Sequence, residues 1–410
     1  MPDQHAILAP SASKRWMACT PSARLEAREP AKDTSYTREG TIAHAMAEAL
    51  LRGALKAQAA LREYDDTKRL EWPESREHLT EMGGDALLKC FYQCEGEGLD
   101  PDEMMTTVAE NYCRFVWEDY LDALYRDPEA ALLIEAKLKL DEYIPEGFGS
   151  SDAVIIYGRT LCVYDLKYGK GVKVSAVENT QMRCYALGAL LGPAELYDIT
   201  EVSMVIIQPR LQWVSNDIIT ADKLMDWAKE ELRPAAVAAY LGDGPYVPGD
   251  HCRFCAVAPR CKALARKALS LDTSKGGDLM TDDEMADALR GAPAVKAWLS
   301  SLEAYALEQA LGGHRIPGFK VVEGRSVRTI SDPVRAMELL EKAGLQESSY
   351  LKPKELRTIT DLEKLLTKKG FASMLGELVV KPQGKPALVE DSDPRPEMNT
   401  AQEDFNDYTK

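Results

Sequence analysis

Two aspartates and a lysine occur within a stretch that has the pattern of a β-hairpin. Gly158 and Arg159 form a credible two-residue turn between two apolar runs. Counted outward from this turn, Asp152 and Asp165 are cross-strand partners in a non-hydrogen-bonded position, with Cα atoms about 4.5 Å apart. Lys167 follows two residues after Asp165 and therefore points to the same face. The spacing predicts two carboxylates and an ammonium together at the open end of the hairpin.

This arrangement favours metal-assisted hydrolysis. Carboxylates directly opposite each other destabilise a sheet, so a compensating cation is expected. Mg²⁺ prefers one or two carboxylates plus substrate phosphate, and it lowers the pKa of bound water, which Lys167 can position or deprotonate. In the simpler alternative, both aspartates are solvated strand ends with Lys167 as their salt-bridge partner. The prediction depends on the register, because a longer turn would send the aspartates to opposite faces.

Four cysteines form a second candidate site. Cys252, Cys255 and Cys261 are closely spaced, and Cys19 is a remote fourth candidate. Four thiolates suit either zinc or an iron–sulfur cluster, and His251 could replace Cys19 in a zinc site. The remaining alternative is a set of buried structural thiols. We expect the other five cysteines to be buried: Cys90, Cys94, Cys113, Cys162 and Cys184.

The elements that must position these residues indicate an α/β core. Residues 1–130 have apolar residues at helical spacing. Residues 131–210 contain four strand-like runs, with a helical segment at 180–192 before the last run. We assign residues 1–130 to the helical N-terminal part and 131–270 to the core with the cysteine cluster.

The rest of the chain has a different character. Residues 271–279 read as a linker, and residues 280–388 as a C-terminal accessory region. In that region we expect helices near 282–312 and 332–344 and a hairpin around 318–330. The acidic, proline-containing tail at 389–410 is expected to be disordered.

Composition bounds the class of protein. The chain has 410 residues, 45% of them hydrophobic and 28% charged, as in ordinary globular proteins. Neither a membrane span nor a signal peptide is evident, so we expect a reducing cytoplasm, no membrane partner and no disulfide framework. The net charge of −16 weighs against a nucleic-acid enzyme unless a local basic groove offsets it.

Taken together, the motifs resemble the PD-(D/E)XK nucleases, specifically their RecB-like exonuclease branch. Asp152 and the triplet 165–167 match the hairpin of that superfamily. In this branch a helix with a Gly-x-x-x-His motif comes first, as in residues 40–44. A helix with Gln and Tyr four residues apart follows, as in Gln181 and Tyr185, which share one helical face.

The resemblance covers residues 11–265 and implies both a fold and site roles. The fold is a restriction-endonuclease-like core, a mixed central sheet flanked by helices, with a helical N-terminal region, an iron–sulfur clip and a small C-terminal α+β region. Ser151 replaces the proline of the family motif, a frequent change in this branch. Lys167 would be the catalytic lysine, and Gln181 and Tyr185 would orient substrate or lysine. The implied metal ligands are His44, Glu135, Asp152, Asp165 and the Leu166 carbonyl, although His44 alone would read as a buried, neighbour-bonded histidine.

The cysteines extend the resemblance. AddB-type helicase-nucleases and CRISPR-adaptation exonucleases bracket the same core with one early cysteine and a late trio that hold a [4Fe–4S] cluster. Cys19 and the trio Cys252, Cys255 and Cys261 flank this core in the same manner. The whole chain also resembles a family of phage and prophage proteins of unknown function that begins with a serine-rich segment and Trp-x-x-Cys.

These resemblances imply a Mg²⁺- or Mn²⁺-dependent DNA exonuclease of phage replication or recombination in a bacterial host cell. It would act on linear or single-stranded DNA ends, beside a phage single-strand annealing or single-strand-binding protein. One rival is a non-catalytic DNA-binding or scaffold protein on the same fold, and another is a zinc-dependent structural protein. Lys170 and Lys173 could touch phosphate near the site, or lie in a solvated loop. A basic run in the accessory region could contact DNA or be a solvated face: Lys352, Lys354, Arg357, Lys364, Lys368 and Lys369.

Overall fold

The chain divides into two units, Met1–Lys267 and Ala268–Lys410. The predicted linker at 271–279 and most of the predicted tail at 389–410 fall outside the described residues. Among the described residues, no helix is both long and apolar enough to cross a membrane. The computed structural model describes residues 6–30, 35–65, 67–269, 281–324, 328–352, 355–380, 386–390 and 394–398.

A five-stranded mixed sheet forms the centre of the first unit. The strands follow sequence order, antiparallel except for β3 and β4, which are parallel. A helical crossover joins this parallel pair, as parallel neighbours require. The mixed α/β fold is therefore confirmed. The strands are β1 (Ala131–Lys139), β2 (Phe148–Tyr157), β3 (Thr160–Leu166), β4 (Glu201–Gln208) and β5 (Trp213–Thr220).

The predicted hairpin register is also confirmed. Tyr157 pairs with Thr160, and Val154 pairs with Val163, across the turn at Gly158. Gly158 has a φ of 51°, a left-handed conformation that glycine adopts without strain. The edge strand β5 was not predicted, although Trp213–Thr220 alternates half-buried and exposed residues with the period of two of a strand.

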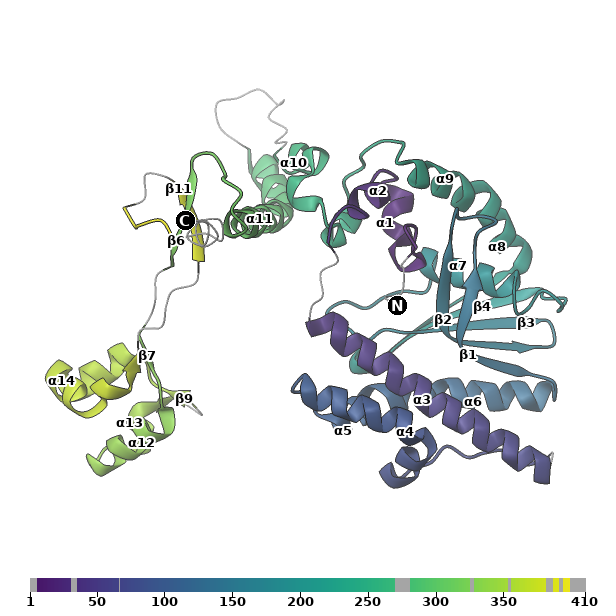
Figure 1. Ribbon diagram of the computed structural model, residues 1–410, viewed down its shortest axis with the longest axis horizontal. Coiled ribbons are helices and arrows are strands. Elements are labelled where there is room, and N and C mark those ends of the chain that lie inside the picture. Colours follow the sequence, from purple (N-terminus) through teal and green to yellow (C-terminus); the bar gives the residue numbers. More distant parts are fainter. Residues whose placement is uncertain are drawn as a thin grey trace, which may run out of the picture. The chain divides into compact units, whose positions relative to one another are not determined.

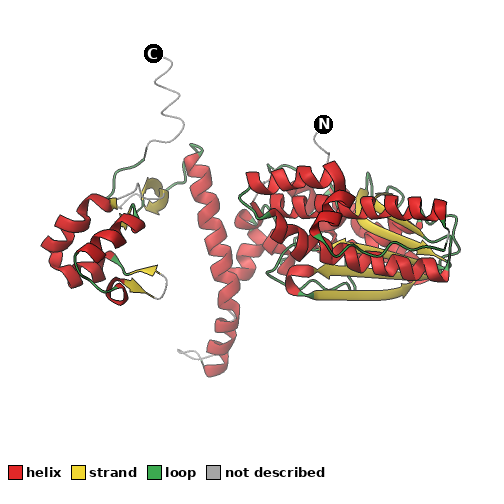
Figure 2. Ribbon diagram, turned by 90° about the horizontal axis from the view of Figure 1, so that it is seen from below, coloured by secondary structure: helices red, strands yellow, loops and turns green. Residues whose placement is uncertain are grey.

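Helices cover both faces of this sheet (Figures 1 and 2). One face packs on α3 (Ser35–Tyr64), α4 (Arg76–Gly96), α5 (Pro101–Met104), the π-helical turn η2 (Met105–Ala109) and α6 (Glu110–Arg126). The other packs on α1 (Ser13–Ala18), α2 (Ser22–Glu26), α7 (Thr180–Leu190), α8 (Ala221–Trp227), η4 (Ala228–Leu232) and α9 (Arg233–Leu241). The short turns η1 (Pro10–Ala12), η3 (Pro209–Leu211), η5 (Asp250–Phe254) and η6 (Ala258–Arg260), with α10 (Lys262–Leu269), complete the unit.

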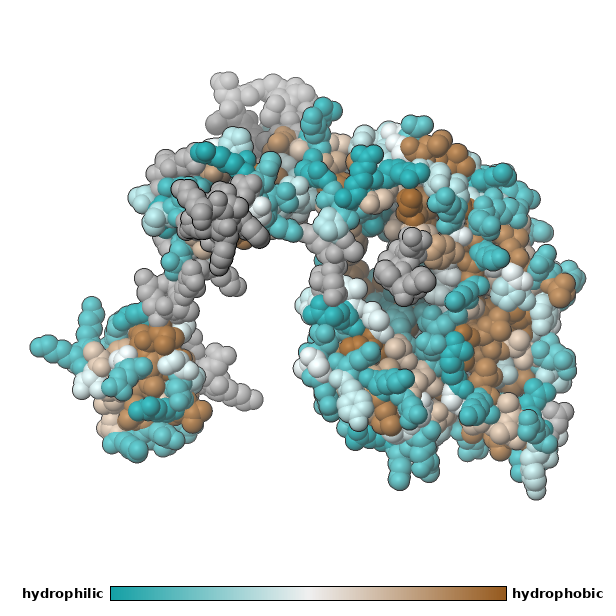
Figure 3. Space-filling view, viewed as in Figure 1, coloured by the Kyte–Doolittle hydropathy of each residue, from teal (hydrophilic) through white to brown (hydrophobic). Residues whose placement is uncertain are grey.

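The two layers correspond to two hydrophobic cores. Along β2, Ala153 and Ile155 belong to the core under α3 and α6, whereas Val154 and Ile156 belong to the core under α7. This alternation follows from the pleat of the strand, and it explains why the run is apolar at every position. In Figure 3, hydrophobic residues gather around the sheet of this unit, between helices with mostly hydrophilic outer sides.

The second unit has a small core of its own, which includes Leu340, Tyr350, Leu362 and Phe371. The predicted hairpin around 318–330 is wrong, because β6 pairs with β11 and β7 pairs with β10. Each of these strands pairs with a strand distant in sequence, and a local turn pattern cannot predict such a pairing. The elements are α11 (Asp282–Leu311), β6 (Phe319–Glu323), β7 (Thr329–Ile330), α12 (Pro333–Lys342), α13 (Glu347–Tyr350), β8 (Leu351–Lys352), β9 (Glu355–Leu356), α14 (Ile359–Leu375), η7 (Gly376–Leu378), β10 (Val379–Val380) and β11 (Pro386–Glu390).

Candidate functional site

The open end of the β2–β3 hairpin is where the predicted site residues meet. The regular pairing ends at Ala153 and Tyr164, one step before Asp152 and Asp165. Beyond this point the Asp152 carboxylate replaces a backbone acceptor of strand β2: its Oδ2 accepts a hydrogen bond from the Leu166 backbone N–H at 2.6 Å. The side chain of Asp152 is thereby fixed beside the end of β3, while β2 continues to pair with β1.

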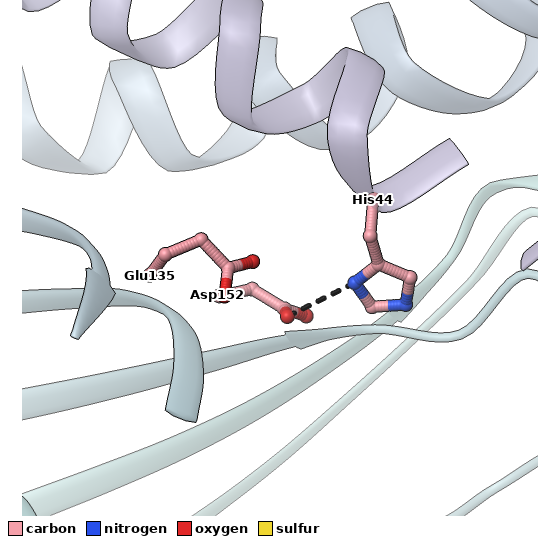
Figure 4. Close-up of side chains that lie close together, drawn as sticks. All are labelled: His44, Glu135 and Asp152. Atoms are coloured by element: carbon pink, nitrogen blue, oxygen red, sulfur yellow. Dashed lines mark hydrogen bonds and ion pairs between the residues drawn. The ribbon is translucent and has the colours of Figure 1, made fainter. Parts of the chain in front are cut away.

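Asp152 belongs to a group of three potential ligands from three different elements (Figure 4). His44 comes from α3, Glu135 from β1 and Asp152 from β2, and one ligand atom of each lies within 4.8 Å of the others. His44 Nδ1 is 3.0 Å from Asp152 Oδ1. An imidazole with two carboxylates is a donor set that suits a divalent cation such as Mn²⁺ or Mg²⁺.

Glu135 reaches this group through an unusual backbone. Its neighbours Ile134 and Ala136 pair with Ala153 and Ser151, so Glu135 lies opposite Asp152 while the regular pairing is interrupted there. The φ of Glu135 is 49°, in the left-handed region that non-glycine residues rarely adopt. Such strain costs on the order of 1–3 kcal/mol and persists where surrounding structure enforces it, commonly at functional sites.

Electrostatics in this group favour a bound cation. Burial and the adjacent Asp152 carboxylate raise the pKa of Glu135 to about 7. Burial alone would lower the pKa of His44, but Asp152, with smaller contributions from Asp165 and Glu135, raises it to about 9. Two carboxylates at this separation repel each other, and the imidazole compensates only when it is protonated.

A second group adjoins the first on the side of α7. Lys167 Nζ lies 3.0 Å from Asp165 Oδ2 and donates to Gln181 Oε1 at 2.9 Å. The Gln181 amide donates in turn to Asp165 Oδ1 at 3.1 Å and to the Tyr185 hydroxyl oxygen at 3.0 Å. Gln181 therefore bridges lysine and aspartate. Burial raises the pKa of Asp165, the Lys167 ammonium opposes this shift, and the Asp152 carboxylate adds to it.

One residue near this site gave no signal in the sequence. Tyr112 of α6 is fully buried, and its hydroxyl has no hydrogen-bond partner within the described part of the chain. Burial raises its pKa well above the ordinary value, with contributions from the charges of Asp152, Asp165 and Glu135. An orphaned buried hydroxyl is costly, so its presence beside the carboxylates needs a reason. In the sequence, Tyr112 is simply one more aromatic residue on the apolar face of a helix.

The structure thus brings seven of the predicted side chains into two adjoining groups: His44, Glu135, Asp152, Asp165, Lys167, Gln181 and Tyr185. The eighth residue, Leu166, contacts Asp152 through its N–H. A ligand role for its carbonyl stays a prediction.

The four candidate cysteines line one cavity. Cys19 follows α1, Cys252 lies in η5, and Cys255 and Cys261 end η5 and η6. Arg15, Tyr246, Pro248 and His251 also contribute to the wall. All four thiols are half-buried. The early cysteine and the late trio therefore lie around the same cavity.

The chemistry of the cavity fits a sulfur-ligated group. Burial raises the pKa of the Cys19 thiol, and Cys252 and Cys261 add to this shift. Burial and the nearby Glu26 carboxylate raise the pKa of Cys255 to about 11. Thiols clustered in this way give up their protons to a positive centre. Among the described residues, no three of the cysteine sulfurs lie within 4.8 Å of one another.

Polar contacts between distant segments hold the cavity walls together. Glu26 of α2 accepts from Arg15 Nε at 2.6 Å and from the Ala256 backbone N–H at 2.8 Å. Arg24 donates to the Tyr240 carbonyl, and Arg260 pairs with Glu29. Side chains near the N-terminus therefore form polar contacts with the segment that carries the cysteine trio.

The remaining predicted positions are placed as follows. The other five cysteines are buried, as predicted. Trp16 is also buried in the core. Lys354 and the side chain of Lys352 lie outside the described part of the structure. Lys364, Lys368 and Lys369 are exposed on α14 of the second unit.

The fold and site together define a mixed α/β protein with a histidine–carboxylate group near the C-terminal end of strand β3 and a four-cysteine cavity. Residues 5–396 match the family described as "Protein of unknown function (DUF2800)". The chain belongs to this family.

Proposed function

We propose that this chain is a Mg²⁺- or Mn²⁺-dependent DNA exonuclease of the PD-(D/E)XK superfamily. The observation that carries the proposal is the convergence, near the C-terminal end of β3, of His44 and Glu135 with the hairpin residues Asp152, Asp165 and Lys167. These residues come from a helix and three strands in the order that the RecB-like branch implies. Residues that served only as solvated strand ends would have no reason to meet a half-buried histidine from a distant helix.

His44, Glu135, Asp152 and Asp165 are the residues that would hold the cation, with the Leu166 carbonyl as a further candidate. A divalent cation bound there supplies positive charge to the scissile phosphate and lowers the pKa of water. Of these residues, His44, Glu135 and Asp152 form the compact trio, and Asp165 is the link to the lysine.

Lys167 is the residue that positions the attacking water. Two directions of its ammonium are taken by Asp165 and Gln181, and the remaining N–H can point to a water or a phosphoryl oxygen. In hydrolysis the water oxygen bonds to phosphorus and releases one proton to solvent, the bond from phosphorus to one sugar oxygen breaks, and that oxygen takes up a proton from solvent. Gln181 and Tyr185 keep the lysine oriented throughout.

The cysteine cavity is proposed to hold a [4Fe–4S] cluster as a structural staple. A tetrahedral zinc ion has Zn–S distances of about 2.3 Å, which brings its sulfurs to roughly 3.8 Å from one another. The absence of any cysteine trio within 4.8 Å among the described residues favours a larger group over a single ion. Zinc, with or without His251, is the alternative, and iron and zinc analysis of the purified protein distinguishes the two.

We place the enzyme in phage DNA replication or recombination in the bacterial cytoplasm, acting on linear or single-stranded ends beside a single-strand annealing or single-strand-binding protein. The net charge of −16 favours one rival, a non-catalytic DNA-binding or scaffold protein on the same fold. The intact lysine–aspartate pair opposes it, since binding alone requires no such pair.

Cleavage of end-labelled linear and circular DNA, single- and double-stranded, tests the proposal. Anaerobically prepared wild type is compared with Lys167→Ala, with Mg²⁺ and with Mn²⁺, and with Lys229→Ala as an exposed-lysine control. Degradation of linear DNA by wild type and the control, lost in Lys167→Ala, is expected. Folded wild type that cleaves none of the substrates, or an equally active Lys167→Ala, would overturn the proposal.

A further inference from the structure

The segment between Lys167 and Gln181 begins and ends at the candidate site. It leaves β3 just after Lys167, whose backbone N–H donates to the Ile207 carbonyl at 2.9 Å. It ends at Asn179, whose side chain caps α7. Because Lys167 and Gln181 are hydrogen-bonded to each other, both ends of the segment meet at the site. We call residues 168–179 the strap.

The strap has no regular secondary structure, yet side chains of the neighbouring strands fix its backbone. Gln208, buried at the end of β4, accepts from the Val174 N–H and donates to the carbonyls of Gly169 and Val172. From β5, Trp213 Nε1 donates to the Val174 carbonyl at 3.0 Å. Burying an amide side chain to shape a connection indicates that the shape of the strap matters.

Ser215 and Asp217 of β5 complete this set of tethers. Ser215 Oγ accepts from the Ala176 N–H at 2.9 Å, and the Asp217 carboxylate accepts from the Glu178 N–H at 3.1 Å. The backbone is therefore held at several points along its length, and a ligand would meet a preformed surface.

Three cations lie on or beside the strap. Lys170 and Lys173 are exposed on it. The Lys173 ammonium lies 4.4 Å from the centre of the Trp213 ring, and the Arg210 guanidinium of η3 lies 4.5 Å from that of Tyr168. Aromatic rings hold these two cations in place, and no carboxylate of the described residues forms an ion pair with either of them. The nearby acids are Glu39, which accepts a hydrogen bond from the Tyr168 hydroxyl at 2.7 Å, and Glu103, whose charge also acts on Tyr168. Glu178 and Asp217 lie at the far end of the strap.

The glycines of the strap are not required by the fold. A Cβ atom at Gly169 or Gly171 would meet nothing within 4 Å, and neither residue has a left-handed φ. Packing and backbone conformation therefore give no reason for glycine at either position. Close approach of an external chain does give a reason, because glycine lets a ligand reach the backbone N–H groups.

Building on the proposed function, we infer that the strap, with Arg210, seats the phosphodiester backbone of the nucleic acid next to the bond that is cut. Lys170, Lys173 and Arg210 contact successive phosphates, and the open backbone at Gly169 and Gly171 lets the strand lie close. On a chain of net charge −16, this is a local cationic surface of the kind a nuclease needs. Gln208 acts as a positioning residue that keeps the surface in shape.

The test is equilibrium binding of labelled single-stranded and duplex oligonucleotides to the full chain, without divalent cation, at several salt concentrations. Each phosphate contact contributes about 0.7–0.9 to the slope of log affinity against log salt. The triple variant Lys170→Ala, Lys173→Ala, Arg210→Ala should lower the slope by about 2–3 for at least one oligonucleotide and weaken binding at least tenfold in low salt. The variant Gly169→Ala, Gly171→Ala should weaken binding several-fold with little change in slope.

The matched control removes the same charge from exposed lysines elsewhere: Lys56→Ala, Lys223→Ala, Lys229→Ala. If the strap triple binds no more weakly than this control, the inference is wrong, even where nuclease activity is present. Loss of binding in the strap triple alone, with no cleavage by wild type, supports the strap and contradicts the nuclease. Should the triple fail to fold in thermal melts, Lys170→Ala alone must lower the slope by about 1, or the inference is wrong.

Discussion

The histidine–carboxylate site and the cysteine cavity both gather acidic groups that resist ionisation. Burial raises the pKa of Glu135 to about 7 in the first and that of Cys255 to about 11 in the second. A bound cation would stabilise the ionised form of both groups, but the two groups offer different ligand atoms. Oxygen and imidazole nitrogen suit hard or borderline divalent cations, whereas four thiolates select iron or zinc.

The two regions also differ in how they are assembled. Most of the carboxylate site comes from a continuous hairpin and the helix that follows it, with His44 added from α3. The cysteine cavity joins residue 19 to residues 252–261, and contacts such as Arg15–Glu26 hold its walls. The difference is one of assembly: the first site gathers mostly neighbouring elements, with Glu135 from β1 and His44 from α3, whereas the second brings together parts of the chain that are far apart in sequence.

The largest expected effect separates the two roles. Asp165→Asn removes the carboxylate that pairs with Lys167, so cleavage should fall by roughly 10²–10⁴-fold, while iron content stays at the wild-type level. Rates on labelled linear DNA and iron analysis of the same preparation check this, with the exposed Asp226→Asn as control. Loss of iron in Asp165→Asn would contradict the separation.

Cys19→Ser should show the opposite pattern. Losing the link between chain start and cysteine trio is expected to reduce iron content sharply and to lower the free energy of unfolding by about 2–4 kcal/mol, comparable with loss of a cross-link. For a unit of this size that is roughly 4–16 °C in melting temperature. Iron analysis and thermal melts under anaerobic conditions measure both. Cys90→Ala should keep its iron, and unchanged iron in Cys19→Ser would disprove the assignment.

A smaller effect is expected at Gln181, which bridges Lys167 and Asp165 without touching substrate in our account. Gln181→Ala should lower kcat about 10–100-fold, as loss of a partner of a site residue does, with KM for DNA changed little. Steady-state kinetics distinguish this from a binding role, because a rise in KM alone would place Gln181 in substrate binding.

The smallest effect concerns Tyr112. Tyr112→Phe removes an unsatisfied buried hydroxyl, so the metal-free protein should be as stable or more stable, by up to about 1 kcal/mol. If that hydroxyl faces the loaded cation site, Mn²⁺ affinity should fall about tenfold. Calorimetric titration with Mn²⁺ and melts of the metal-free protein measure these two shifts. Unchanged Mn²⁺ affinity would make Tyr112 a purely structural residue.

Much of the carboxylate site could be predicted from the sequence, because the position of a hairpin turn determines which residues of the two strands pair. Once the turn at Gly158 was fixed, the pairing of residues 153–157 with residues 160–164 followed, and Asp152 and Asp165 lie one step beyond it. The strained backbone of Glu135 and the position of Tyr112 could not be predicted in this way, because both depend on packing between elements far apart in sequence.

The second unit was less predictable for the same reason. Its helices follow hydrophobic periodicity, and α12 at Pro333–Lys342 lies where it was expected. Its strands are short and pair at long range, for example Thr329–Ile330 with Val379–Val380, so a local turn signal misled the prediction of a hairpin. Edge strand β5, in contrast, carried a clear alternation and could have been found.

The most direct test of the central claim is a single titration of the divalent-stripped protein with Mn²⁺, in which metal binding and DNA cleavage are followed together. The account predicts saturable Mn²⁺ binding, cleavage of linear DNA that rises in proportion to occupancy, and loss of both in Asp152→Asn. Mn²⁺ that binds without any cleavage, or Asp152→Asn that cleaves like wild type, would contradict it.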